Sequence, residues 1–280
     1  MSQTDLSAEL APEQVVNLDL YPIQDCDSPE FDQLTEDLRE KLDRDQYVVL
    51  PDFIRPAARQ LAIAQIEQVL HRANHNASNR NCYLQRVPDI DFDPQHPRNV
   101  FLEASTRMLA ADLLPSASPL KTLYYWEQTK RMVARIVGTE KLYENEDTLQ
   151  PVNALCYRNG DQSNWHFDSV NAFTMTLMLQ APDRGGRFEM HPNTRSDSDP
   201  NYAMVSEVLL GQAEGIVEVG REEAALCIFR GCNSLHRVSP VEGERLRIMG
   251  VFVYENEPGI IGDAEVNETV YGRRAEITTK

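Results

Sequence analysis

Hydrophobic residues recur with a helical period early in the chain. After Ser28 they stand at spacings of three and four, in the order Phe31, Leu34, Leu38 and Leu42. This spacing predicts an amphipathic helix, and Ser28 is a residue type that caps a helix at its first turn. The run YVVLPDFI, residues 47–54, is short, β-branched and interrupted by Pro51, which predicts a strand. Pro56 then begins a second helical pattern.

The rest of the first half is less regular. Residues 1–28 are polar and acidic, which predicts an N-terminal arm. Residues 74–98 are rich in Asn, Asp, Pro and Arg and show little periodicity. Two further helical patterns cover residues 101–114 and 120–138, so we expect residues 29–140 to form a mainly helical support.

Beyond residue 140 the pattern changes to short strand-like runs separated by Gly, Pro, Asn and Asp. These runs cover residues 152–158, 172–181, 186–192, 215–220, 224–231, 236–241 and 245–255. Helices followed by such strands fit an α+β fold in which residues 141–280 form an antiparallel sandwich or barrel. We expect a single domain over residues 1–280, because the helices would otherwise have no sheet to cover.

Composition narrows the possible classes of function. The 41% hydrophobic content allows a real core, and no apolar run approaches the roughly 20 residues of a membrane helix. The N-terminus lacks the features of a signal peptide, so we expect a soluble cytoplasmic protein. A net charge of −17 disfavours a nucleic-acid partner and favours a small-molecule substrate. Five cysteines without a CxxC pair indicate reduced thiols.

The stretch NWHFDSV, residues 164–170, contains the first candidate chemistry. In a strand, His166 and Asp168 face one side while Trp165 and Phe167 face the other. An imidazole and a carboxylate on one face supply two ligands of the facial triad that, with a second histidine, binds Fe(II). An HxD pair also occurs by chance, and zinc uses the same ligand types in hydrolytic sites.

The third ligand must come from the other five histidines. His71 and His75 lie near a helix end, and His96 and His191 each precede a proline. His236 differs because it follows the strand AALCIFRG and leads into another strand-like run. A ligand at a strand margin in the same sheet as His166 is geometrically reasonable.

A strand after His236 contains a candidate for cosubstrate binding. An Fe(II) oxygenase of this kind uses 2-oxoglutarate, whose far carboxylate needs a buried cation, best supplied by a bidentate arginine. In ERLRIMGVFVY, Arg245 and Arg247 lie on the same face of an otherwise apolar strand. An arginine that points into a core needs a carboxylate partner. The alternative is an edge strand on which both arginines are solvated.

Several linked motifs now stand in order between residues 152 and 273. They include WHFD, LMLQAPDRGGRFE, PNTRSD, SLHRVSPVEGERLRI and YENEPG. Together they resemble the Fe(II)/2-oxoglutarate-dependent oxygenases. The resemblance is nearest to the group of free-amino-acid hydroxylases and lysine radical halogenases.

The resemblance implies a double-stranded β-helix, a cupin-like jelly roll with the N-terminal helices packed on one side. It also implies iron ligation by His166, Asp168 and His236, binding of 2-oxoglutarate by Arg247, and O2 as a further cosubstrate. The halogenases of this group have glycine at the position of Asp168, where chloride binds, so the carboxylate disfavours halogenation. Hydrogen abstraction from an unactivated carbon is then expected, with hydroxylation, desaturation and ring closure all open.

The resemblance further implies a free amino acid or a derivative as substrate. Arg80 is our candidate for the substrate carboxylate, and Asn153, Ser169 and Tyr271 are candidates for the same pocket. Trp165 is either a pocket wall or a core residue. Which amino acid binds stays open, because the family pattern is weakest over residues 74–98.

Two other functions compete with this interpretation. The same sheet occurs in non-catalytic jelly-roll proteins that bind small ligands, and the same triad would serve a zinc hydrolase. Neither a binding protein nor a zinc hydrolase needs Arg247 together with the three ligands His166, Asp168 and His236. The acidic cluster EVGREE, residues 218–223, is expected to be a solvated loop, and the helical half offers a possible homodimer face.

Overall fold

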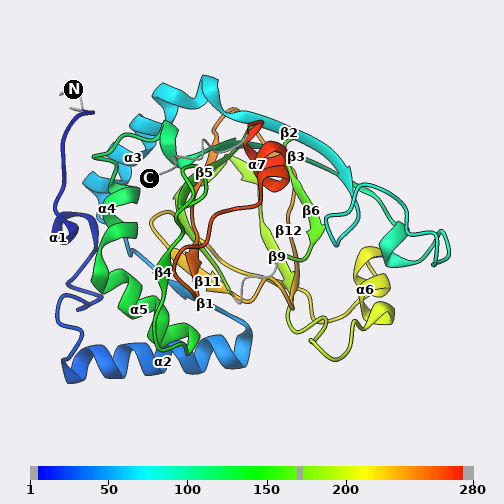
Figure 1. The fold of residues 1–280 in the computed structure, drawn as a ribbon, viewed down its shortest axis with the longest axis horizontal. Coiled ribbons are helices and arrows are strands. Elements are labelled where there is room, and N and C mark those ends of the chain that lie inside the picture. The colour runs from blue at the N-terminus through cyan, green and yellow to red at the C-terminus, as the bar shows by residue number, and fades with distance from the viewer. Residues whose placement is uncertain (1–5, 169–172, 274–280) are drawn as a thin grey trace.

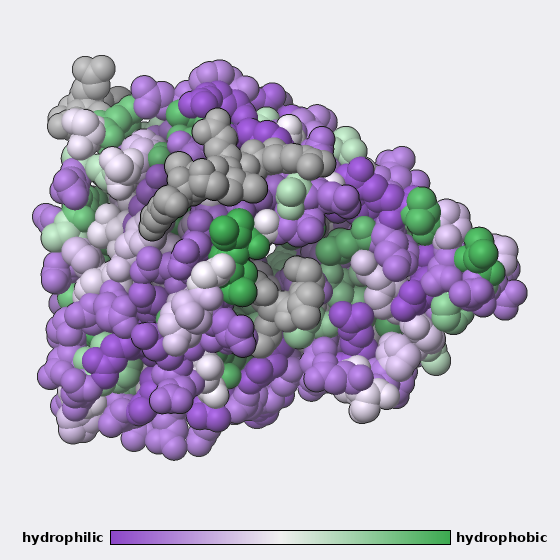
Figure 2. Space-filling view, viewed as in Figure 1, coloured by the Kyte–Doolittle hydropathy of each residue, from purple (hydrophilic) through white to green (hydrophobic). Residues whose placement is uncertain are grey.

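The computed structural model describes residues 6–168 and 173–273. Most helices lie in the first half, as α1 (Pro12–Val15), α2 (Pro29–Asp45), α3 (Pro56–Val69), α4 (Pro119–Tyr125) and α5 (Glu127–Val137), with α6 (Tyr202–Leu209) and α7 (Ala264–Tyr271) later. Figure 1 shows α2 to α5 gathered on one side of the strands, with α6 on the opposite side. On the face drawn in Figure 2, hydrophilic residues cover most of the surface.

Helix α2 forms where its sequence pattern predicts it. The Ser28 hydroxyl accepts a hydrogen bond from the Phe31 backbone N–H at 3.2 Å, which caps the first turn. Phe31 and Leu42 are buried against the core, and the helix ends where Gln46 takes a left-handed conformation with φ of 66°. The predicted helix and its cap are confirmed.

The strands form two antiparallel sheets. The larger has the order β1-β11-β7-β14-β5-β3-β2 and the smaller has the order β10-β9-β12-β6. Their strands are β1 (Tyr47–Leu50), β2 (Asn74–Arg80), β3 (Leu102–Leu109), β5 (Val152–Tyr157), β6 (Ser163–His166), β7 (Thr174–Gln180), β9 (Phe188–His191), β10 (Val217–Glu218), β11 (Leu226–Phe229), β12 (Leu235–Val238) and β14 (Arg247–Phe252). Two short pairs complete the fold, β4 (Tyr143–Glu144) with β15 (Tyr254–Glu255) and β8 (Arg184–Gly185) with β13 (Val241–Glu242).

Two apolar layers hold these elements together. The first lies between the helices and the larger sheet, and it includes residues of the N-terminal segment such as Val16 and Ile23. The second lies between the two sheets, where Tyr157 and Phe229 of the larger sheet meet Phe188 of the smaller. Two rings of this second layer, Phe188 and Phe229, lie against His236.

The prediction that residues 29–140 are mainly helical is wrong in part. The hydrophobic pattern of residues 101–114 predicts a helix, but Leu102–Leu109 is strand β3, which pairs with β2 and β5. Residues 74–80, which had no clear period, form β2. Pairing with distant strands overrides the local helical pattern. The predicted helix over 120–138 is divided at Trp126 into α4 and α5.

Among the residues that the structure describes, no helix has both the length and the apolar character needed to cross a membrane.

Candidate metal centre

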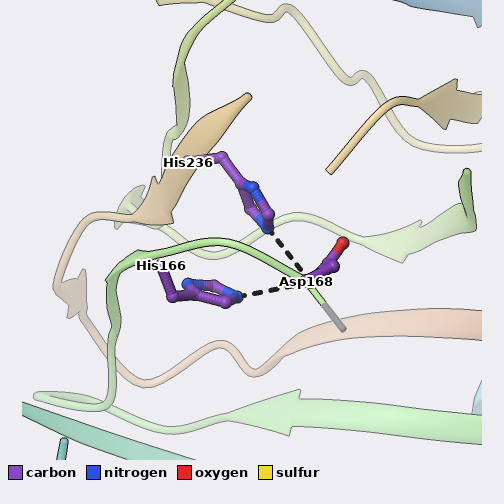
Figure 3. A group of neighbouring side chains, drawn as sticks. All are labelled: His166, Asp168 and His236. Carbon is purple, nitrogen blue, oxygen red and sulfur yellow. Dashed lines mark ion pairs between the residues drawn. The ribbon is translucent and has the colours of Figure 1, made fainter. Parts of the chain in front are cut away.

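Three predicted ligands meet in the smaller sheet. His166 is the last residue of β6 and lies opposite His236 of β12 in the antiparallel register. Asp168 follows two residues after His166, beyond the end of the strand. Its Oδ1 atom lies 3.6 Å from His166 Nε2 and 3.4 Å from His236 Nε2 (Figure 3). The structure thus brings together the three residues that the sequence predicted as ligands.

Backbone carbonyl groups orient both imidazole rings. His166 Nδ1 lies 2.7 Å from the Asn164 carbonyl oxygen, and His236 Nδ1 lies 2.9 Å from the Ser234 carbonyl oxygen. Each Nδ1 therefore carries a hydrogen and donates a hydrogen bond to the carbonyl oxygen, which leaves a lone pair on Nε2. Both Nε2 atoms face Asp168, the arrangement that a metal ion requires of its histidine ligands.

The region around Asp168 fixes its carboxylate. Thr174 on β7 donates its hydroxyl hydrogen to Oδ2, and the Asp168 backbone N–H donates to the Gly231 carbonyl at 3.0 Å. A Cβ atom at Gly231 would lie 2.1 Å from Oδ2, so any side chain there would displace the carboxylate. The glycine therefore allows the close approach that positions Oδ1 between the histidines.

Burial and neighbouring charges keep His166 neutral and Asp168 ionised. Burial, followed by repulsion from His236, lowers the pKa of His166 to about 4. Burial alone would raise the pKa of Asp168, but the neighbouring His236 outweighs it and holds that pKa well below its usual range. A neutral imidazole and an ionised carboxylate are the ligand forms that bind metals. The donor set fits Fe(II), whose remaining coordination positions would stay open.

The two aromatic residues that alternate with the ligands, Trp165 and Phe167, belong to one hydrophobic cluster. Phe167 is buried, and the Arg195 guanidinium carbon lies 3.9 Å from its ring centroid. Trp165 is 6% exposed, packs in the same apolar cluster as Leu235, and also lines a cavity beside His166. Trp165 is thus both a core residue and a cavity wall.

The two candidate arginines after His236 have different surroundings. Arg247, on β14, is fully buried, and its Nε donates to the Gly186 carbonyl at 3.1 Å while Nη1 has no hydrogen-bond partner. Burial lowers its pKa to about 10. Arg245 precedes the strand, is 43% exposed and pairs with Glu223 at 2.6 Å. The expectation that both share one strand face is wrong, because β14 begins only at Arg247.

Arg80 and His166 both line a cavity of about 130 Å³. Alternate residues of β2, namely Asn76, Ser78 and Arg80, line it together with residues of β3 and β6. The Nε and Nη2 atoms of Arg80 are buried without a hydrogen-bond partner. Burial lowers the Arg80 pKa, and nearby Arg86 adds to that effect.

The remaining candidates for the substrate pocket lie elsewhere or outside the described residues. The Tyr271 hydroxyl donates to Asn153 Oδ1 at 2.6 Å, and Asn153 Nδ2 donates to the Leu149 carbonyl at 2.8 Å. These residues hold α7 against β5 and are not among those that line the Arg80 cavity. Ser169 lies outside the described residues.

The sequence patterns did not identify one buried charged residue near the metal centre, Arg221. The expectation of a solvated loop over residues 218–223 is wrong for Arg221, whose Nε and Nη2 atoms are buried without a hydrogen-bond partner. Its guanidinium carbon lies 3.4 Å from the Phe188 ring centroid. Adjacent acidic residues made the segment resemble a surface loop, and the only contrary signal was an arginine shortly before an apolar strand.

Comparisons with known proteins identify the family and the fold. The model of a family described as Halogenase D matches residues 31–271, whereas no curated protein matches the chain. Among solved structures, a 2OG-Fe(II) oxygenase family member from Burkholderia pseudomallei is 16% identical, with a TM-score of 0.50 and coverage of 81% of this chain and 92% of that chain. The expected jelly-roll fold is confirmed.

Two further structural neighbours come from nogalamycin biosynthesis. The carbocyclase SnoK is 13% identical, with a TM-score of 0.54 and coverage of 86% of this chain and 93% of its own. The epimerase SnoN, in complex with Fe3+, alpha ketoglutarate and nogalamycin RO, is 13% identical, with a TM-score of 0.53 and coverage of 79% and 83%. At this level of identity they establish a shared fold.

Proposed function

We propose that this chain, which belongs to the halogenase D family, is an Fe(II)- and 2-oxoglutarate-dependent oxygenase that acts on a free amino acid or a close derivative. The observation that carries the proposal is the convergence of His166, Asp168 and His236. Two oriented imidazoles and one ionised carboxylate are the facial triad of such enzymes. Structural neighbours that are named as 2OG-Fe(II) oxygenases, or that contain iron and alpha ketoglutarate, support the same choice.

Asp168 favours oxygenation over halogenation within this family. A halogenase needs a free coordination position for chloride where this chain has a carboxylate. Thr174 and the contact with Gly231 hold that carboxylate toward both histidines. We therefore expect the triad to retain all three protein ligands.

Arg247 distinguishes an oxygenase from a zinc hydrolase with the same triad. A fully buried guanidinium with an unpartnered nitrogen is unfavourable unless a ligand completes it. The distal carboxylate of 2-oxoglutarate would pair with it, with charge-assisted hydrogen bonds. A hydrolase would have no use for this charge.

The cavity beside His166 supports an amino-acid substrate. Arg80 lines it, two nitrogens of the same guanidinium are buried without a hydrogen-bond partner, and the lining contains neither Asp nor Glu. The charge that this cavity recognises is therefore negative, which suits a substrate carboxylate. A volume of about 130 Å³ suits a small molecule and places it next to a metal ligand.

The protein's own residues would bind and orient the reactants. Arg80 would hold the substrate carboxylate so that one carbon faces the triad, and the apolar part of the lining, which includes Leu102 and Trp165, would exclude water. Bound iron and 2-oxoglutarate would supply, with O2, the oxidising power to remove hydrogen from an unactivated carbon, with release of succinate and CO2. Position then selects the product.

A succinate-release screen across free amino acids, with mass spectrometry of the products, tests the proposal. We expect one amino acid class to stimulate succinate formation and to gain one oxygen atom. A loss of two hydrogen atoms would instead indicate desaturation or ring closure, which the carbocyclase neighbour makes worth measuring.

Variants connect this activity to the triad. His166→Ala and Asp168→Ala should abolish succinate formation, while His71→Ala, an exposed histidine on another element, should retain it. Activity that persists in both triad variants would refute the proposal. Binding of a small ligand without turnover by any tested amino acid would favour a non-catalytic jelly roll.

A further inference from the structure

Two arginines have unpartnered guanidinium nitrogens in the layer between the sheets. Nη1 of Arg247, and both Nε and Nη2 of Arg221, are buried without a hydrogen-bond partner. Among the residues that the structure describes, no carboxylate forms an ion pair with either guanidinium. Buried charges of this kind are retained in proteins when a partner or ligand completes them.

The two guanidinium groups lie close to one another. Arg247 Nη2 lies 3.9 Å from the Met249 sulfur, and Arg221 Nη1 lies 3.5 Å from the same sulfur. Arg221 Nη1 also donates to the Thr176 hydroxyl oxygen at 3.1 Å, which holds the group against β7. Two positive charges therefore share one thioether, a weak acceptor that neutralises neither of them.

Arg221 also extends toward the metal centre. Its guanidinium carbon lies 3.4 Å from the centroid of Phe188 and 5.1 Å from that of Phe229. The same two rings lie against His236, with centroid separations of 5.6 Å and 5.1 Å. Arg221 is thus connected to Arg247 on one side and, through two aromatic rings, to a metal ligand on the other.

We infer that Arg221 is a second binding residue for the distal carboxylate of 2-oxoglutarate, acting beside Arg247. This inference rests on the proposed function. One carboxylate between the two guanidinium groups would supply the missing negative charge and satisfy nitrogens that the protein leaves unpaired. Such a site selects a dicarboxylic 2-oxo acid over a monocarboxylic one, which gains nothing from either arginine.

The selectivity between two 2-oxo acids tests this role. Under anaerobic conditions with Fe(II), the visible charge-transfer band would be titrated with 2-oxoglutarate and with 2-oxobutyrate, which lacks the distal carboxylate. We expect Arg221→Met to reduce the preference for 2-oxoglutarate by about 10- to 100-fold, the range for loss of a charge-assisted hydrogen bond. Arg221→Lys, which keeps the charge, should give an intermediate preference.

Two controls separate ligand binding from folding. Arg131→Met on helix α5 removes one positive charge from an exposed ion pair with Asp27 and should leave the preference unchanged. The melting temperature of metal-free Arg221→Met should change little, because relief of a buried charge without an ion-pair partner offsets the loss of the hydrogen bond to Thr176 and of the contact with Phe188.

The outcomes distinguish this inference from the function on which it rests. An unchanged preference in both Arg221 variants, or equal weakening of both acids with a lower melting temperature, would give Arg221 a structural role and overturn the inference. A wild-type protein that gives no band with either acid would overturn the proposed function itself.

Discussion

Replacement of Arg247 by methionine should separate stability from cosubstrate binding. In the described structure this guanidinium has one hydrogen bond to a carbonyl oxygen, a distant thioether and an unpartnered Nη1. Methionine carries no charge, and its unbranched chain fills the space of the arginine side chain as far as Nε. The substitution therefore removes the positive charge while it retains much of the buried volume.

The magnitudes follow from this environment. Removing one partner of a buried charge pair is worth about 3 to 5 kcal/mol, so the dissociation constant for 2-oxoglutarate should rise by on the order of 100- to 1000-fold or more. In the metal-free protein, which binds no 2-oxoglutarate, the same substitution should be stabilising. Relief of an unpaired buried charge contributes roughly 1 to 4 kcal/mol to the free energy of unfolding, and loss of the bond to Gly186 offsets about 1 kcal/mol of it.

Two measurements check this prediction. Anaerobic titration of the Fe(II) protein gives the affinity for 2-oxoglutarate, and denaturant unfolding of the metal-free protein gives its stability. Arg245→Met is the matched control, since it removes the same charge from a half-exposed ion pair with Glu223 and should change each quantity by about 1 kcal/mol or less. Unchanged affinity in Arg247→Met would refute the assignment of Arg247 to the distal carboxylate.

The remaining predictions concern the triad and the cavity. Asp168→Gly removes a metal ligand and should abolish the oxygenated product. Metal titration should show that iron affinity falls by more than the roughly 10- to 100-fold that is typical when a residue hydrogen-bonded to a ligand is lost. Arg80→Met should raise the KM for the amino acid by on the order of 30-fold while 2-oxoglutarate affinity stays constant; a parallel loss of both would contradict the cavity assignment. Because the pKa of His166 is lowered to about 4, the unfolded chain protonates first as pH falls below about 6.5, so metal-free stability should decrease by up to about 3 kcal/mol between pH 6.5 and 4. Denaturant unfolding across that range should show a slope that His166→Gln flattens.

Some of the site was predictable because it depends on neighbours in the chain. The spacing of His166 and Asp168 predicts that they face one side, and the structure places both toward His236 even though the strand ends at His166. Arg247 was identifiable as a charge within an apolar run. The alternation of side chains in extended backbone gives both results without knowledge of the fold.

Other parts required contacts between distant residues. Residues 102–109 have a helical pattern, but hydrogen bonds to β2 and β5 make them a strand. Arg221 lies among acidic residues in the sequence, yet its guanidinium group packs against the aromatic rings of Phe188 and Phe229. Neither outcome is encoded by nearby residues.

The sequence by itself determined the local structure of this protein: the capped helix α2, the strand-rich second half and the residue types of a metal site. Only the tertiary structure decided that β12 lies beside β6, which brings His236 to His166, and that Arg221 lies beside Arg247 while Arg245 turns outward to Glu223. The physical reason is that periodicity and capping act within a few residues, whereas strand pairing and burial depend on side chains far apart in the chain.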